Sequence, residues 1–362
     1  MKNPSCLFYG PGQAKFEERP IPEIEDPHDV VVRIAFTGVC GSDVHFWVHG
    51  GINAHVVSDR PLVMGHEASG IVHLVGPSVT SLSPGDHVAL EPGYPCRRCA
   101  RCKAGRYNLC PGMKFAGSPP DNHGTLTRYF KLPEDYCYKI DPEAIGLDEA
   151  VLLEPIAVAV HSVRQVGVKA GDEVVVFGAG TVGVLCAAVA REFGARRIIS
   201  VDINQDKLSF AEAFVGESSS VFTPIQGLSA EENAHALLCA KEIDLPAEGG
   251  GADVVIEATG AEPCIQMGIH VLRTGGSYIQ TGMGKRDANI PIGLIADNEL
   301  VVKGCFRYGP GDYKLALEFV EAGKIVLKSL ITRVYPFERV TDAWETTRRG
   351  EGIKTLIRGV ED

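Results

Sequence analysis

The amino-acid sequence predicts two architectures in one chain, an all-β, barrel-like region and an α/β region built on a parallel sheet. Up to about residue 155 the chain is rich in Gly, Pro, Val and His, and short β-type runs alternate with turn residues, as in barrels with long loops. Further on, apolar strands alternate with helical segments, which is the pattern of a parallel sheet. The length of 362 residues suits two domains better than one.

The predicted elements follow in chain order. Strands are expected over 30–34 and 70–75, then a helix over 148–165 that breaks or kinks at Pro155. The α/β region should hold strands over 173–177, 197–202, 252–257 and 276–281, and helices over 182–193 and from Asn204. Residues 216–250 are polar and predict one helix near 230–241. From about 297 the pattern turns irregular again, with a helix over 312–322.

Charge and composition argue against several classes of protein. Asp and Glu number 46 against 35 Lys and Arg, a formal charge of −11 without a basic block, so we expect no nucleic acid and no membrane as partner. No run approaches the ~18 apolar residues of a membrane helix, and the first residues resemble neither a signal peptide nor a transit peptide. These features predict a cytoplasmic protein, in which clustered cysteines more often bind metal than form disulfides.

A glycine-rich motif lies between a predicted strand and a predicted helix. Gly178, Gly180 and Gly183 fit the pattern G-x-G-x-x-G directly after the strand over 173–177. In this context the first glycine permits a tight turn, the second lets the backbone approach a pyrophosphate, and the third allows close packing of helix on sheet. The motif predicts a dinucleotide at a helix N-terminus. The alternative is a tight strand–helix turn without a ligand.

Asp202 ends the next predicted strand and indicates which dinucleotide is used. Its carboxylate would accept hydrogen bonds from the adenosine ribose and repel a 2′-phosphate. No Arg follows among the next three residues, so NAD is expected rather than NADP, and Lys207 is a candidate for a further ribose contact. The alternative role for Asp202 alone is that of a helix N-cap.

Four closely spaced cysteines form the most specific pattern of the sequence: Cys96, Cys99, Cys102 and Cys110. Four thiolates can close a tetrahedral shell around zinc and leave no open position, so this site should be structural. Basic residues stand among the cysteines and would offset their negative charge. The alternatives are an iron–sulfur cluster and cysteines without metal.

A second group of metal-binding residue types consists of Cys40, His66 and Glu67, with Glu154 as a further candidate. A thiolate, an imidazole and a carboxylate supply three ligands and leave room for water or substrate, which catalytic zinc requires. Taken singly, the first three are more often an inert buried thiol, a core histidine and a solvated carboxylate. Together with a nicotinamide-cofactor motif, they favour a catalytic metal.

These motifs resemble the medium-chain, zinc-dependent alcohol dehydrogenase family over essentially the whole chain. Segments 45–47, 107–110, 153–155, 259–263 and 306–308 narrow the resemblance to its polyol dehydrogenase branch. The resemblance implies a GroES-like β-barrel catalytic domain, 1–155 and 297–362, interrupted by a Rossmann domain with a doubly wound parallel sheet, 156–296. It also implies a homo-oligomer, usually a homotetramer and otherwise a homodimer.

The resemblance further implies a role for each site residue. Cys40, His66 and Glu67 would hold a catalytic zinc, while Glu154 would either ligate that metal or hydrogen-bond the water on it. The four-cysteine loop would hold a second, structural zinc. Positions that match substrate contacts are Phe46, Glu154, Arg307 and Tyr308. Positions that match NAD contacts are Val182, Lys207, Thr281, Gly282, Met283, Cys305, Phe306 and Arg307.

The implied reaction is oxidation of a polyol to a ketose with hydride transfer to NAD. Xylitol oxidation to D-xylulose is favoured by residues 306–313, with L-arabinitol and sorbitol as alternative substrates and a non-catalytic NAD- and zinc-binding protein as a remote alternative. Ser42 and His45 have a spacing suited to a proton relay. A water held by Glu154 is a competing route, and His45 could instead contact a cofactor phosphate.

Overall fold

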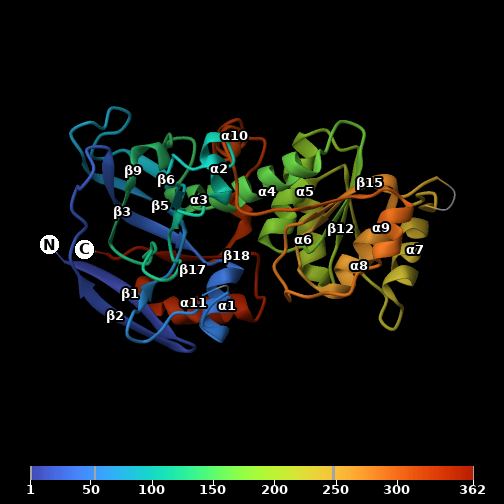
Figure 1. Cartoon of the computed structure of the whole chain (residues 1–362), viewed down its shortest axis with the longest axis horizontal. Coiled ribbons are helices and arrows are strands. Elements are labelled where there is room, and N and C mark those ends of the chain that lie inside the picture. Colours follow the sequence, from blue (N-terminus) through green and yellow to red (C-terminus); the bar gives the residue numbers. More distant parts are fainter. Residues whose placement is uncertain (1, 53, 247–248, 362) are drawn as a thin grey trace. The chain divides into compact units, whose positions relative to one another are not determined.

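The computed structural model describes residues 2–52, 54–246 and 249–361, which form two compact units (Figure 1). The first unit combines both parts of the chain that flank the second, Met1–Glu154 and Gly309–Asp362, and the second unit is Pro155–Tyr308. The second unit therefore interrupts the first. The chain returns to the first unit at Gly309 instead of near 297, because residues 301–304 form a strand in the sheet of the second unit.

The first unit is mainly β-structure. Its largest sheet has the strand order β10-β6-β5-β3-β18-β17, with β9 also paired to β3, and smaller sheets have the orders β2-β1-β4 and β7-β8. The strands are β1 (Asn3–Gly10), β2 (Gln13–Arg19), β3 (Asp29–Gly38), β4 (Leu62–Val63), β5 (Glu67–Val75), β6 (His87–Leu90), β7 (Gly93–Tyr94), β8 (Lys114–Phe115), β9 (Tyr129–Pro133), β10 (Cys137–Lys139), β17 (Ile331–Tyr335) and β18 (Lys354–Arg358). The helices are α1 (Gly41–His49), α2 (Ala100–Lys103), α3 (Leu147–Ala150), α10 (Asp312–Glu321) and α11 (Val340–Arg348).

The two ends of the chain are held together by strand pairing and by packing. β18, from the C-terminal segment, pairs antiparallel with β3. α1 and α11 lie side by side (Figure 1), and their buried residues share a hydrophobic core that includes Phe8, Phe46 and Trp344. A second core of the first unit fills the space between β3, β5, β6 and β9 with aliphatic residues such as Val30 and Leu132. The C-terminal segment therefore completes structure that the N-terminal segment begins.

The second unit is an α/β domain with a six-stranded parallel sheet of order β13-β12-β11-β14-β15-β16. The strands are β11 (Glu173–Phe177), β12 (Arg197–Val201), β13 (Ser219–Phe222), β14 (Ala252–Glu257), β15 (Leu272–Gln280) and β16 (Val301–Gly304). The helices are α4 (Leu153–Val166), which begins at the junction of the units, α5 (Thr181–Glu192), α6 (Gln205–Val215), α7 (Ala230–Ala240), α8 (Glu262–His270) and α9 (Ile292–Asp297). The strand order reverses between β11 and β14, where doubly wound sheets bind ligands.

Two of the differences from the prediction have a local physical reason. The helix expected over 148–165 is divided into α3 and α4 by a turn at Val151 and Leu152, and Pro155 lies in the first turn of α4. Proline is tolerated there because its missing N–H would have no partner within the helix. The polar region 216–250 contains β13 in addition to α7. β13 lies at the edge of the sheet, where polar residues such as Ser219 and Ser220 are accommodated.

Candidate metal and cofactor sites

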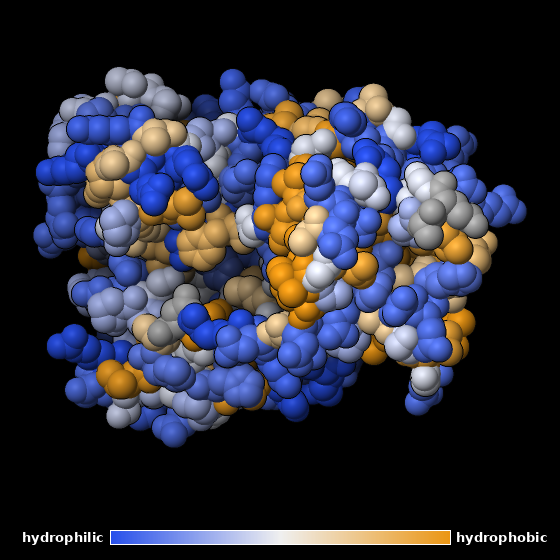
Figure 2. Space-filling view, turned by 45° about the vertical axis from the view of Figure 1, so that its right-hand side comes forward, coloured by the Kyte–Doolittle hydropathy of each residue, from blue (hydrophilic) through white to orange (hydrophobic). Residues whose placement is uncertain are grey.

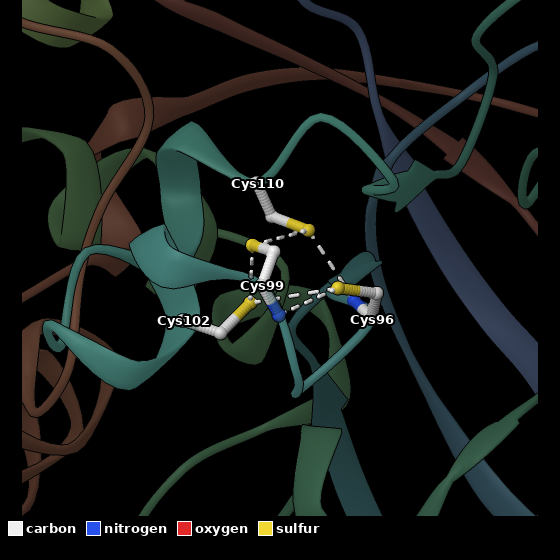
Figure 3. A group of neighbouring side chains, drawn as sticks. All are labelled: Cys96, Cys99, Cys102 and Cys110. Atoms are coloured by element: carbon white, nitrogen blue, oxygen red, sulfur yellow. Dashed lines mark hydrogen bonds between the residues drawn. The ribbon is translucent and has the colours of Figure 1, made fainter.

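The four predicted thiols lie together in one loop of the first unit. The sulfur atoms of Cys96, Cys99, Cys102 and Cys110 are all within 4.8 Å of one another and point toward a common centre (Figure 3). Cys99 Sγ is 3.4 Å from Cys102 Sγ and 3.8 Å from Cys110 Sγ. Separations of this size suit sulfurs that each lie about 2.3 Å from a tetrahedral zinc ion.

Backbone N–H groups of this loop donate hydrogen bonds to the sulfur atoms, which favours the thiolate form that binds a cation. Cys99 N–H donates to Cys96 Sγ, and Cys96 N–H donates to Cys110 Sγ, each at 3.4 Å. Donors on Arg98 and Cys99 lower the pKa of Cys96 to about 6, whereas burial and the neighbouring thiols raise the pKa of Cys102 to about 12. Four thiolates so close together require a cation between them, and the donor set fits a closed zinc site.

The residues of the second predicted group also meet in space. Ligand atoms of Cys40, His66 and Glu67 lie within 4.8 Å of one another. Cys40 is the residue before α1, and Glu67 begins β5, so a helix start and a strand start bring thiolate and carboxylate together. His66 is buried beside the ring of Phe115, at a centroid distance of 5.5 Å. Three ligands of these types leave a position open, as catalytic zinc sites do.

Two further charged residues, Asp43 and Lys354, contact this group. The sequence analysis did not single them out. Asp43 Oδ2 accepts a hydrogen bond from Cys40 N–H at 2.9 Å, and Asp43 Oδ1 lies 3.8 Å from His66 Nδ1. Carboxylates in this position orient metal-bound imidazoles. Lys354 in β18 forms a fully buried ion pair with Glu67 Oε2 and donates to Val39 O at 3.0 Å. Spacing to Cys40 could have indicated Asp43, but nothing local in the sequence indicates Lys354.

The electrostatics of this group fit a cation. Burial lowers the pKa of His66, but the carboxylate of Asp43 and the thiol of Cys40 raise it, with a net increase to about 10. Glu154 contributes in the same direction from the first turn of α4. The site therefore attracts positive charge, and a zinc ion would supply it. Glu154 is not in the group whose ligand atoms lie within 4.8 Å of one another, which favours a role through water or substrate over direct ligation.

The other predicted residues of α1 lie in different surroundings. His45 is exposed, and its Nδ1 is 2.9 Å from Gly51 O, which leaves Nε2 as the acceptor nitrogen. Ser42 is half-buried one residue before Asp43. Phe46 is 7% exposed and packs edge-on against Phe8, with ring centroids 6.5 Å apart. This core position gives Phe46 packing contacts, and its role as a substrate contact stays a prediction.

In the second unit, the glycine motif forms the turn between β11 and α5. Gly178 has a φ of +98°, which side chains disfavour. A Cβ on Gly183 would lie 1.8 Å from Gly178 O, so any side chain there would collide with the turn. A Cβ on Gly180 would meet nothing within 4 Å, and Gly180 is the N-cap of α5. The open backbone at this helix start fits a pyrophosphate.

Asp202 is held at the mouth of this turn by the backbone. Its Oδ2 accepts from Ala179 N–H at 2.8 Å, and its Oδ1 accepts from Asn204 N–H at 2.9 Å. Asn204, rather than Asp202, is the N-cap of α6 and accepts from Lys207 N–H. The alternative of Asp202 as a helix N-cap is therefore wrong. The half-buried carboxylate retains lone pairs for a ribose hydroxyl.

The remaining predicted cofactor residues follow the ends of neighbouring strands. Residues 281–283 follow β15, and residues 305–307 follow β16, at the same carboxyl edge of the sheet as the glycine turn. Thr281 Oγ1 is 3.0 Å from Ser162 Oγ, which also donates to Cys305 Sγ at 3.2 Å. Met283 and Phe306 are about half exposed or more, at 63% and 48%. Parallel sheets bind dinucleotides at this edge.

No helix in the described part of the chain combines the length and the apolar character needed to span a membrane.

Comparison with known proteins gives matches along the whole chain. The alcohol dehydrogenase GroES-like domain matches residues 26–142, and the zinc-binding dehydrogenase family matches residues 181–322. The probable D-xylulose reductase A of Aspergillus clavatus is 54% identical over 361 residues, which are 100% of this chain and 98% of that protein. D-xylulose reductase A of Aspergillus niger is 53% identical over 360 residues, 99% of this chain and 98% of that protein.

Solved structures share the fold at lower identity. An Escherichia coli oxidoreductase of unknown specificity has a TM-score of 0.91 at 29% identity, covering 100% of both chains. L-Idonate 5-dehydrogenase from Escherichia coli K-12 has a TM-score of 0.87 at 27% identity, covering 99% of this chain and 98% of the other. The predicted GroES-like domain with an inserted Rossmann domain is confirmed. The chain belongs to the zinc-dependent alcohol dehydrogenase family.

Proposed function

We propose that the chain is a zinc- and NAD-dependent polyol dehydrogenase that interconverts xylitol and D-xylulose. One observation carries this proposal: a cysteine, a histidine and a glutamate meet in one open ligand group in a chain that is 53–54% identical, over its whole length, to D-xylulose reductases. Non-catalytic relatives would be expected to lose one of these ligands, and none is lost.

In this proposal, Cys40, His66 and Glu67 hold the catalytic zinc, and Lys354 balances the charge of Glu67. When bound, zinc supplies Lewis-acid chemistry that lowers the pKa of a substrate hydroxyl, and NAD accepts the hydride. Glu154 accepts a hydrogen bond from the reacting hydroxyl or from an intervening water. The thiolates of Cys96, Cys99, Cys102 and Cys110 hold the second, structural zinc.

We propose Ser42 and His45 as the route by which the hydroxyl proton reaches solvent. The exposure of His45 and its acceptor Nε2 suit the solvent end of such a relay. Ser42, three residues earlier on α1, is less exposed and suits the inner end. The other polar contacts of the polyol are assigned to Glu154, Arg307 and Tyr308.

The proposed NAD site is the carboxyl edge of the parallel sheet. The pyrophosphate lies on the α5 N-terminus beside Gly178 and Gly180, and Asp202 accepts from the adenosine ribose. Further contacts come from the residues that follow the strands and open the helices: Val182, Gly183, Lys207, Thr281, Gly282, Met283, Cys305, Phe306 and Arg307.

Initial-rate kinetics test the proposed reaction. The protein is assayed with NAD and with NADP against xylitol, L-arabinitol and sorbitol, and with D-xylulose and NADH in the reverse direction. The expected result is the highest kcat/KM for xylitol with NAD. A higher kcat/KM for L-arabinitol or sorbitol would replace xylitol as the proposed substrate, and no turnover with any polyol would refute the proposed activity.

Metal analysis separates the enzyme from a non-catalytic zinc protein. The two ligand groups predict about two zinc ions per chain. About one zinc ion per chain would instead indicate that only one of the two groups binds metal.

We propose a homotetramer, with one of its interfaces at the free edge of β16. This edge strand carries exposed Val301 and Val302, 44% and 46% exposed, and Ile290 and Ile292 are also exposed. On the face drawn in Figure 2, hydrophobic residues gather in patches on a mostly hydrophilic surface. A second copy pairing with this edge would satisfy its backbone groups and cover the valines.

Substitution of Val302 by Asp tests this interface. The expected result is a smaller assembly by light scattering, with Val334→Asp as a control because Val334 is 44% exposed on β17, an edge strand of the first unit. An unchanged mass of the Val302→Asp protein would refute the interface.

We also propose that the protein acts in the cytoplasm. None of the eleven cysteines, all of which lie in the described ranges, forms a disulfide, and five of them belong to the two ligand groups. Reducing compartments preserve such thiols for metal binding. Fractionation of cells that express the protein tests this location, and recovery in an organelle fraction would contradict it.

A further inference from the structure

Glu257 is a buried carboxylate at the carboxyl end of β14. Its side chain is 0% exposed, and β14 lies between β11 and β15 in the middle of the sheet. No Lys, Arg or His in the described ranges forms an ion pair with it. Hydrogen bonds alone must then stabilise the buried carboxylate. The residues that donate these hydrogen bonds show which segments Glu257 holds.

Four donors from two different segments meet on this carboxylate. Oε1 accepts from Thr259 N–H at 2.8 Å and from the hydroxyl of Thr259, and Oε2 accepts from Gly260 N–H at 2.8 Å. The fourth donor is Gln280 Nε2, at 2.6 Å from Oε2. Gln280 is the last residue of β15, so one side chain connects the ends of two neighbouring strands.

The same residue also binds the segment after β15 through its backbone. Glu257 O accepts from Thr281 N–H at 2.8 Å and from Gly282 N–H at 2.7 Å. Gln280 Nε2 donates to Gly282 O at 2.8 Å, and Tyr278 Oη donates to Gln280 Oε1 at 2.6 Å. Thr281 and Gly282 are thus bound to the backbone of Glu257 directly, and Gly282 is also bound to its carboxylate through Gln280.

The two strand-end loops, 258–260 and 281–284, are packed backbone on backbone. A Cβ on Gly260 would lie 2.3 Å from Met283 C, and a Cβ on Gly284 would lie 1.8 Å from Gly260 O. A Cβ on Gly282 would lie 2.4 Å from Gly260 N. No space is left for side chains between the loops, and the carboxylate of Glu257 holds the first loop directly and the second through Gln280.

We propose that Glu257 is a positioning residue for NAD, acting through Thr281, Gly282 and Met283. This inference rests on the proposed function, which assigns those three residues to the cofactor. The carboxylate also occupies the N–H groups of Thr259 and Gly260, so these two groups are not available to a phosphate. The corresponding end of β11 keeps its open glycine turn, which directs the pyrophosphate there and the rest of the cofactor toward residues 281–283.

NAD binding by the zinc-loaded Glu257→Gln protein tests the inference. Gln keeps the size of the side chain but removes its charge and turns an NH2 group toward backbone donors. We expect the Kd for NAD, measured by calorimetry, to rise by about tenfold or more, since hydrogen bonds to a charged acceptor are lost. Zinc content and the KM for xylitol should stay at the values of the unmodified protein.

Glu173→Gln provides the matched control. Glu173 is a 7% exposed carboxylate at the opposite end of the same sheet, paired with Arg196 at 2.9 Å. An equal rise in Kd for both variants would indicate general loosening of the sheet and overturn the proposal. If the Glu257→Gln protein does not fold, Gln280→Met, which removes one donor, should still raise the Kd, and an unchanged Kd would overturn the proposal.

The proposed function and this inference can fail separately. If the unmodified protein does not bind NAD, the proposed function fails, and the inference fails with it. If the unmodified protein binds NAD and Glu257→Gln binds it with the same Kd, the positioning role alone is refuted.

Discussion

At the scale of single residues, Cys40 differs from the other ten cysteines. Among the described residues it is the thiol that lies with an imidazole and a carboxylate in one ligand group. We predict that Cys40→Ser loses the catalytic zinc and at least about 1,000-fold in kcat, since metal Lewis acidity supplies several kcal/mol. Zinc analysis should fall from about two ions to one, while NAD still binds. Cys239→Ser, at an exposed thiol on α7, should behave as the unmodified protein, and near-normal turnover of Cys40→Ser would refute the assignment.

At the same scale, we predict that Asp202 and Ile203 decide the choice between NAD and NADP. Asp202 faces the glycine turn, and Ile203 is 84% exposed beside it. The double substitution Asp202→Ser with Ile203→Arg removes a repulsive charge and adds a phosphate-binding one. The ratio of kcat/KM for NAD to that for NADP should fall by about 10- to 100-fold. Ile203→Arg alone is the control. An unchanged ratio in the double variant would show that Asp202 does not bind the adenosine ribose.

At the scale of elements, Glu91 links the four-cysteine loop to the sheet of the first unit. Its carboxylate accepts from Tyr107 Oη at 2.5 Å and from Tyr138 Oη at 2.9 Å. Tyr107 belongs to a short 3₁₀ turn just before Cys110, and Tyr138 belongs to β10. Burial raises the pKa of Glu91 to about 7, although both tyrosine hydrogen bonds lower it.

This raised pKa predicts a pH dependence of stability. Between the unfolded pKa of about 4.3 and the folded value, the folded protein retains a proton that the unfolded chain has lost. The free energy of unfolding therefore falls as pH rises through this window, on the order of 2–3 kcal/mol from this group. Glu91→Gln removes that decrease, and Glu143→Gln, at an exposed residue, keeps it. Urea unfolding at pH 5 and pH 7.5 measures the difference, and equal decreases in all three proteins would contradict the prediction.

At the scale of the whole molecule, the last strand completes a site that begins near the N-terminus. Lys354 in β18 and Glu67 in β5 are both 2% exposed and form an ion pair. We predict that Lys354→Met lowers the free energy of unfolding by about 3–5 kcal/mol, because a buried carboxylate loses its partner. Occupancy of the catalytic zinc should fall as well, since Lys354 also holds the loop at Val39.

Lys328→Met is the control for this prediction. Lys328 pairs with Asp148 at 2.6 Å, but its side chain is 67% exposed, and exposed pairs contribute about 0–1 kcal/mol. Denaturant unfolding and zinc analysis of both variants measure the difference. Equal effects of the two substitutions would show that burial of the Lys354 pair has no special importance.

Much of the fold, the four-cysteine site and the glycine turn could be predicted from the sequence, because their signals were local. The four cysteines lie in one loop, and the glycine motif lies in one strand–turn–helix unit, so nearby residues define both sites. β11 and β14 have the predicted bounds because their residues are apolar and end in turns. The polar edge strand β13 and the membership of β16 in the sheet were not predictable in this way, since pairing with a neighbouring strand decides both.

The sequence by itself determined the chemistry available to this protein: two groups of metal-binding side chains, a glycine turn for a dinucleotide and an acidic residue beside it. The tertiary structure alone decided what surrounds them. It placed Lys354 against Glu67, assigned Phe46 to a core and brought Gln280 onto Glu257. Each of these contacts joins residues on different elements, and a buried charge or ring takes its partner from whatever the fold packs beside it, which no local pattern encodes.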